Sequence, residues 1–137
     1  MPQYRITKII KFCYGHRLLD YDGNSNFLHG HNAYVEIDVT STTLDERGMV
    51  ASFGSLKGAV ESWVQNNFDH QVILSHLDPL GNQLEKWGQM VHNLTGNPTS
   101  EILAKILFMV TQDLGFAVSE VRFWETPTSC GTYSGGD

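Results

Sequence analysis

An alternating segment in the first third of the chain constrains the fold most strongly. In residues 31–42, Ala33, Val35, Ile37 and Val39 occupy one side of an extended chain, and polar residues occupy the other side. A period of two is typical of a strand with one buried face. We therefore expect a sheet that a second layer of structure covers on one side.

The segments on either side of this strand supply further elements. Residues 4–13 contain several β-forming residues and predict another strand, whereas residues 17–28 combine Asp, Gly, Asn and Ser as loops do. Apolar residues at helical spacing predict a helix over residues 53–67. A short strand is expected at about 89–94.

The last third of the chain predicts a second helix and a final strand. Thr99 can cap a helix that ends at about Leu114, because Gly115 then stops it. A strand over about 117–125 follows. The whole order predicts one α+β domain over residues 1–137, with an antiparallel sheet and two helices packed on one of its faces.

Charge and composition exclude several classes of protein. Nine Lys and Arg against fifteen Asp and Glu give a net charge of -6, and no basic cluster indicates a nucleic-acid partner. No apolar run is long enough to cross a bilayer, and the N-terminus lacks a secretory signal, so we expect a cytoplasmic protein without membrane contact. Cys13 and Cys130 are far apart and are interpreted as reduced thiols.

Three histidines form the candidate metal site. His29 and His31 are two residues apart, which places both imidazoles on one face if a strand begins at about Leu28. His16 follows the end of the first predicted strand, and an antiparallel neighbour can bring it close. Three neutral imidazoles suit zinc and leave its fourth position open. The alternative is a pair of exposed strand histidines with a third elsewhere.

Several motifs together resemble the 6-pyruvoyl-tetrahydropterin synthase and 6-carboxytetrahydropterin synthase family. They are CYGHRL at 13–18, LHGHN at 28–32, FDH at 68–70, NPTSE at 97–101 and WET at 124–126. The resemblance extends from about Tyr4 to Thr128. It implies a tunnelling fold (T-fold), homo-oligomers in the form of trimers stacked as hexamers, and active sites at subunit contacts. It also implies zinc bound by His16, His29 and His31.

The same resemblance implies roles for five further residues. Asp69 and His70 would assist proton transfer, Glu125 would accept hydrogen bonds from the pterin ring, and Thr99 and Ser100 would contact the pterin. The residues by themselves also allow plainer interpretations. Asp69 and His70 could be a helix-terminal acid and a solvated histidine, and Thr99 and Ser100 are common at helix starts.

Ser25 departs from the family pattern. It stands four residues before His29, where the family usually has a proton-transferring cysteine. A serine hydroxyl is far less acidic than a thiol and cannot simply take over that role. Three interpretations remain open: an inactivated or altered enzyme that still binds its ligands, a neighbouring reaction that needs no thiol, or another group in that role. That group could be His70 or a thiol brought near by the fold, with Cys130 as a candidate.

The resemblance implies a lyase that converts 7,8-dihydroneopterin triphosphate to 6-carboxy-5,6,7,8-tetrahydropterin in queuosine and deazapurine biosynthesis, with zinc as cofactor. Two alternatives follow from Ser25. One is a different reaction of the pterin side chain, with a pyruvoyl or hydroxymethyl product. The other is a pterin-binding protein without turnover. Arg17 and Lys57 are the basic groups considered for the triphosphate.

Overall fold

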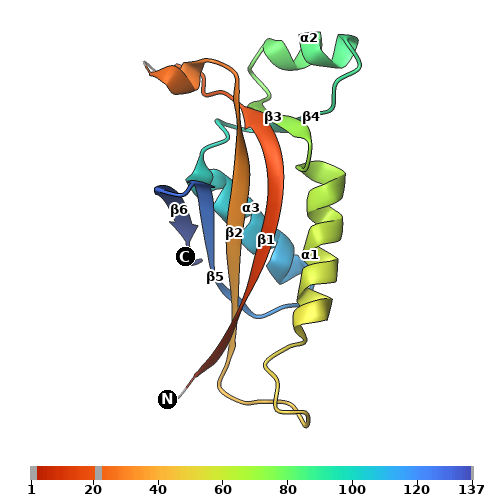
Figure 1. The fold of residues 1–137 in the computed structure, drawn as a ribbon, viewed down its shortest axis with the longest axis vertical. Coiled ribbons are helices and arrows are strands. Elements are labelled where there is room, and N and C mark those ends of the chain that lie inside the picture. The colour runs from red at the N-terminus through yellow and green to blue at the C-terminus, as the bar shows by residue number, and fades with distance from the viewer. Residues whose placement is uncertain (1–2, 21–22, 137) are drawn as a thin grey trace.

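The computed structural model describes residues 3–20 and 23–136 of the chain (Figure 1). Its elements follow in the order β1 (Tyr4–His16), the short 3-10 helix η1 (Asn24–Asn26), β2 (His29–Ser41), α1 (Phe53–Asn67), β3 (Gln71–Ser75), α2 (Leu80–Lys86), β4 (Val91–Leu94), α3 (Ser100–Asp113), β5 (Val118–Thr126) and β6 (Ser129–Tyr133). The α+β class is confirmed. No helix in the described ranges has the length and apolar character needed to cross a bilayer.

The sheet is mixed rather than wholly antiparallel, which corrects the expectation from the sequence. Its strand order is β4-β3-β1-β2-β5-β6. The pairs β1–β2, β2–β5 and β5–β6 are antiparallel, whereas β3 is parallel to both β1 and β4. The parallel pairs arise because α1 carries the chain back to the end of the sheet where β1 finishes (Figure 1). β3 then runs beside the last residues of β1 in the same direction.

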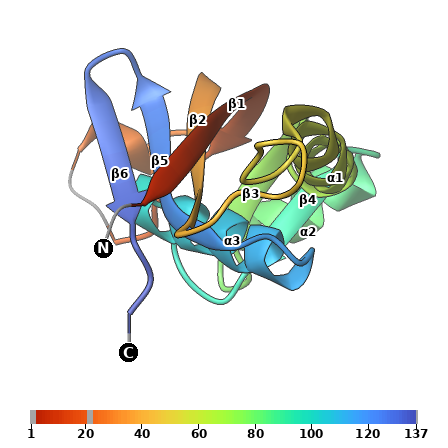
Figure 2. The same ribbon diagram turned by 90° about the horizontal axis from the view of Figure 1, so that it is seen from below.

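Two helices pack on one face of the sheet, as expected, and a third helix lies at its end. The helix predicted over residues 53–67 is confirmed as α1, which Ser52 caps and which buries Leu56, Val60 and Val64. Thr99 caps α3, and both helices line the same side of the curled sheet (Figure 2). Helix α2 was not expected; it lies against β4, where Gly81 allows close approach to Val91.

The hairpin of β1 and β2 positions the site. These strands are 13 residues each and pair from Tyr4–Ser41 to His16–His29. Along β1, Ile10, Phe12, Tyr14 and His16 are buried on the helix-covered face, whereas Lys11 and Cys13 alternate onto the open face. Strand alternation therefore directs neighbouring residues of β1 into two different environments at the same end of the sheet.

Asp38 differs from the simple alternation expected for its strand. It lies on the polar side of β2 but is only 1 % exposed. Arg122 on β5 donates to both carboxylate oxygens at 2.7 and 2.9 Å, and the Thr7 hydroxyl donates at 2.6 Å. These hydrogen bonds lower the pKa of Asp38 despite its burial. The ion pair with Arg122 therefore offsets the free-energy cost of burying the Asp38 carboxylate on the face that no helix covers.

Candidate metal centre and a neighbouring thiol cluster

Three histidines at the paired ends of β1 and β2 converge on the helix-covered face. His16 is the last residue of β1 and lies opposite His29, the first residue of β2, while His31 lies opposite Tyr14. Residues that face one another across an antiparallel pair project to the same side. Each imidazole therefore offers a ring nitrogen within 4.8 Å of the other two. His16 belongs to β1 itself, whereas the sequence placed it just beyond the strand.

Carbonyl groups fix the proton position on two of these rings. His16 Nδ1 lies 2.8 Å from the Pro98 carbonyl oxygen, and His29 Nδ1 lies 2.7 Å from the Phe27 carbonyl oxygen. A carbonyl only accepts, so each Nδ1 carries the proton and each Nε2 has a free lone pair. The two Nε2 atoms are 3.1 Å apart. Facing lone pairs repel at that distance, and a cation shared between them removes the repulsion.

The third ring and the burial of the cluster also fit a metal ion. His31 Nε2 is buried without a hydrogen-bond partner, which is costly unless it binds something. Burial lowers the pKa of His16 to about 4, against the opposing hydrogen bond to Pro98, and burial also lowers the pKa of His31. Both rings are therefore neutral at pH 7, which is the form that binds metal. The three residues form a candidate metal centre.

Glu125 and Tyr14 border this centre. Glu125 Oε1 lies 3.9 Å from His16 Nε2, and burial raises the pKa of Glu125, helped by the charge of Glu101. The Tyr14 ring packs against His16 and His31, with centroids 5.1 and 5.7 Å away. Its buried hydroxyl makes no hydrogen bond of normal geometry, and burial raises its pKa. A ligand with several N–H groups could satisfy both oxygens.

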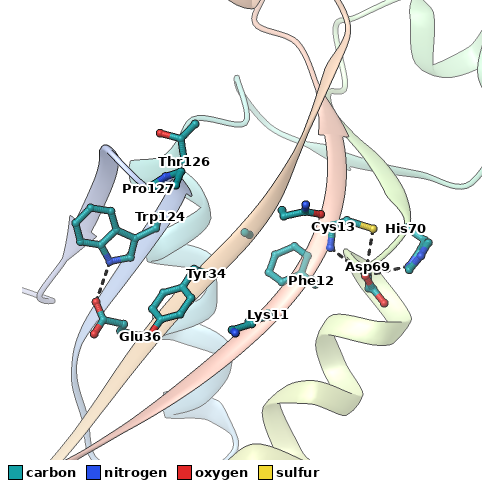
Figure 3. Close-up of a pocket in the computed structure, with 12 residues that line it drawn as sticks. Lys11, Phe12, Cys13, Tyr34, Glu36, Asp69, His70, Trp124, Thr126 and Pro127 are labelled. Atoms are coloured by element: carbon teal, nitrogen blue, oxygen red, sulfur yellow. Dashed lines mark hydrogen bonds and ion pairs between the residues drawn. The ribbon is translucent and has the colours of Figure 1, made fainter.

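Asp69 and His70 lie on the other face of the sheet, next to Cys13. Figure 3 shows the three side chains pointing toward one another at one edge of a pocket. Asp69 Oδ1 is 3.0 Å from His70 Nδ1 and 3.9 Å from Cys13 Sγ. The Asp69–His70 contact expected for an acid–base pair is therefore present. Its thiol neighbour was not expected, because nothing in the sequence pattern places residues 13 and 69 together.

Two pockets are lined by residues of these clusters. The larger, of about 940 Å³, is lined by Cys13, Asp69 and His70 and also by Tyr34 and Trp124 (Figure 3). A second pocket, of about 480 Å³, is lined by residues of both clusters: Cys13, His29, His31 and His70. Within one chain, the second pocket is therefore lined by residues that belong to both clusters.

The other predicted site residues are placed as follows. Ser25 lies in η1, where its carbonyl accepts from the Leu18 amide at 2.9 Å; among the described residues, no hydrogen bond joins its hydroxyl to either cluster. The Thr99 hydroxyl accepts from the Ile102 amide, and the Ser100 hydroxyl donates to Glu101. Their contact with a pterin stays a prediction.

Two further groups considered from the sequence lie elsewhere. Cys130 is exposed on β6, with its sulfur 3.7 Å from the Gly131 carbonyl oxygen. The Arg17 guanidinium donates to both carboxylate oxygens of buried Asp78, at 2.6 and 2.7 Å. Arg17 is thus already paired, which argues against it as a triphosphate ligand.

Pro98 is a residue that the sequence interpretation missed. Its carbonyl orients His16 from 82 positions further along the chain. The available signal was the NPTS segment itself, which was interpreted as a helix start and not as a support for the metal centre. A proline there fixes the entry to α3, and its carbonyl has no competing strand partner.

Fold and site together define an α+β protein with a tri-histidine centre at one end of a curled sheet. The chain belongs to the 6-pyruvoyl tetrahydropterin synthase family, whose sequence profile matches residues 5–136.

Individual relatives agree with this membership. The chain is 35 % identical over 130 residues to the 6-carboxy-5,6,7,8-tetrahydropterin synthase of Rickettsia bellii, covering 90 % of this chain and 94 % of the relative. It is 28 % identical over 134 residues to the enzyme of that name from Haemophilus influenzae, covering 92 % and 95 %.

Solved structures show the same fold. The crystal structure of an uncharacterized protein from Wolinella succinogenes matches with a TM-score of 0.80 at 27 % identity, covering 99 % of this chain and 100 % of that chain. The Caenorhabditis elegans 6-pyruvoyl tetrahydropterin synthase matches with a TM-score of 0.75 at 24 % identity, covering 99 % and 98 %. The T-fold expected from the resemblance is confirmed.

Proposed function

We propose that this protein is a zinc-dependent 6-carboxy-5,6,7,8-tetrahydropterin synthase. It would act on 7,8-dihydroneopterin triphosphate as a carbon–carbon lyase in the cytoplasm, on the route to queuosine and related deazapurines. The observation that carries this proposal is the convergence of His16, His29 and His31, with Nε2 of His16 and His29 left free and Nε2 of His31 unpartnered. The similarity to relatives named for this activity supports it.

Each group has a part in this proposal. Zinc held by the three imidazoles would polarise the oxygen atoms of the substrate side chain. Glu125, half-buried beside His16, would accept hydrogen bonds from the N–H and amino groups of the pterin ring, because its two oxygens match two parallel donors. Asp69 would hold the His70 ring, so that the exposed imidazole can move protons to and from water.

The proposed assembly follows from the same family. We propose a homo-oligomer, a trimer or a hexamer, with active sites at subunit contacts that Thr99 and Ser100 help to shape. The open face supports this, because Tyr34 and Leu28 are exposed there and at the tip of the hairpin. Light scattering of the purified protein measures the oligomeric state directly.

A product assay joined to metal analysis tests the function. The purified protein is analysed for zinc and then incubated with 7,8-dihydroneopterin triphosphate. We expect about one zinc per chain, with acetaldehyde, carboxytetrahydropterin and inorganic triphosphate as products. A pyruvoyl or hydroxymethyl pterin would replace the proposal with a different side-chain reaction. Tight binding of the pterin without any product would replace it with the pterin-binding alternative, which the hydroxyl of Ser25 in place of a thiol favours.

A further inference from the structure

The cluster of Cys13, Asp69 and His70 is organised around one carboxylate oxygen. Asp69 Oδ1 lies 3.2 Å from the Cys13 amide nitrogen, 3.9 Å from Cys13 Sγ and 3.0 Å from His70 Nδ1 (Figure 3). The amide and the thiol can both donate to this oxygen, and so can Nδ1 of the imidazole. A single carboxylate therefore joins a thiol to an imidazole. Asp69 and His70 lie 56 and 57 positions after Cys13 in the sequence.

The backbone holds these three residues in place independently of their side chains. The His70 amide donates to the Cys13 carbonyl at 2.8 Å, and the Asp69 amide donates to the Val64 carbonyl at 2.8 Å. His70 also has a φ of 59°, in the left-handed region that non-glycine residues rarely occupy. Such a conformation costs on the order of 1 kcal/mol and persists where the surrounding structure imposes it.

The cluster is accessible at both ends. The His70 side chain is 80 % exposed to water, while the Asp69 side chain is 26 % exposed. Cys13 is half-buried and lines both pockets of the open face. The smaller pocket is also lined by residues His29 and His31 of β2.

We propose that Cys13 is the proton-transferring thiol of this protein and that Asp69 and His70 form its relay to solvent. This inference rests on the proposed function for its substrate, the side chain of a reduced pterin. It selects among the three interpretations of Ser25: the thiol role is filled by a residue of β1 instead of by the loop before His29. Among the described residues, Cys13 is the cysteine whose sulfur approaches a carboxylate–imidazole pair.

The proton balance closes without any further reactant. A proton first moves from Cys13 Sγ through Asp69 to Nδ1 of His70, which accepts it when the neutral ring carries its own proton on Nε2, leaving a thiolate and an imidazolium. The thiolate then takes a proton from a side-chain carbon of the pterin: the C–H bond breaks, the S–H bond forms, and the electron pair stays on the substrate in conjugation with the ring. Sγ–H next returns the proton to the neighbouring carbon. The proton on His70 moves back through Asp69, and no oxidant is needed.

Turnover of a Cys13→Ala variant tests the role of the thiol. We expect kcat to fall at least 100-fold, which is typical for the loss of a general acid–base group, with KM within threefold of its original value. Metal content stays unchanged because Cys13 faces away from the three histidines. Cys130→Ala is the matched control and keeps full activity. A kcat of Cys13→Ala within threefold of the parent value overturns the proposal. A tenfold rise in kcat from Ser25→Cys alone would add to that result, because it would place the thiol role at position 25.

A second readout needs no substrate and tests the relay. The rate of Cys13 alkylation by iodoacetamide at pH 7.5 is measured in a Cys130→Ser background by mass spectrometry. In His70→Gln the thiolate loses its compensating imidazolium beside the Asp69 charge, so we expect alkylation to slow at least threefold. His76→Gln, at another exposed histidine, is the control. Equal rates in His70→Gln and its parent overturn the relay.

The two readouts separate the failure of this inference from that of the proposed function. If the parent protein binds zinc but forms no product, the lyase assignment fails, and the alkylation rates alone decide whether the relay exists. If the parent forms product and Cys13→Ala does so equally well, the lyase assignment stands and the role of Cys13 is wrong. Circular dichroism and thermal melting of each variant confirm that loss of activity is not loss of fold.

Discussion

Two clusters of three residues lie at the same end of one hairpin, and they differ in almost every physical respect. The histidine centre is on the helix-covered face, where His16 is 2 % exposed and carbonyl groups fix its tautomer. The thiol cluster is on the open face, where His70 is 80 % exposed to water. The first arrangement suits a bound cation, and the second suits proton movement.

The difference shows how one pair of strands can provide two kinds of chemistry. Side chains alternate between the two sides of a strand, so odd-numbered Cys13 and even-numbered His16 of β1 point to opposite faces and contribute to different clusters. Burial removes water from the imidazoles and keeps them neutral, whereas exposure keeps His70 in contact with its proton source. Each of the following predictions changes one side of this comparison.

The largest effect is expected from removing a ligand of the histidine centre. His31→Ala leaves two imidazoles where three are needed, so bound zinc should fall from about one per chain to below a tenth and turnover at least 1,000-fold. Elemental analysis and the product assay measure the two quantities. His76→Ala, away from the centre, should retain both. Full zinc content in His31→Ala would place the metal elsewhere.

Acid should destabilise the metal-free protein through His16. Because the pKa of His16 is lowered to about 4 in the fold from about 6.5 in the unfolded chain, the stability that its neutral form contributes is complete above pH 6.5. That contribution is lost as the pH falls from 6.5 to 4 and amounts to about 3 kcal/mol.

Urea unfolding of the chelator-treated protein at several pH values measures this loss. His16→Gln removes the titrating group, so its stability should depend less steeply on pH over the same range. A parent protein whose free energy of unfolding is constant between pH 6.5 and 4 would show that the buried ring is already protonated or solvated.

Glu125→Gln should weaken substrate recognition while the metal remains. An amide replaces one acceptor oxygen by a donor, so one of two parallel hydrogen bonds to the pterin is lost. We expect kcat/KM to fall about 30-fold, which corresponds to roughly 2 kcal/mol. Zinc content measured in parallel separates this role from metal binding. Loss of zinc in Glu125→Gln would instead make the carboxylate a fourth ligand.

The smallest effect concerns the strained backbone of the open face. His70→Gly relieves the left-handed φ of 59°, so the free energy of unfolding should rise by about 0.5 kcal/mol although the relay is lost. His76→Gly, at a position without a positive φ, should lower stability by a similar amount. Equal destabilisation by both changes would mean that the conformation of His70 carries no strain.

Local patterns in the sequence determined several parts of this protein correctly. The helix over residues 53–67 follows from apolar spacing, and the alternation of Ala33, Val35 and Ile37 gave the buried face of β2. The spacing of His29 and His31 placed both on one face of β2. These features depend on interactions between residues close in sequence, which periodicity records directly.

Besides the short η1, three elements were missed, and they were missed for different physical reasons. β3 is an apolar run of five residues, too short to distinguish from part of a buried helix, and it becomes a strand by pairing with β1 and β4. β6 is a strand because the turn after β5 folds it back onto that strand. α2 has only seven residues, which is too short for apolar residues to show a helical period.

The sequence by itself determined which chemical groups this protein possesses and that His29 and His31 lie on the same side of a strand. Only the tertiary structure decided which groups meet: the parallel insertion of β3 brings Asp69 and His70 to Cys13, and the loop before α3 brings the Pro98 carbonyl to His16. The physical reason is that these contacts join positions 56 to 82 residues apart. Their proximity follows from burying one shared core, which no local pattern encodes.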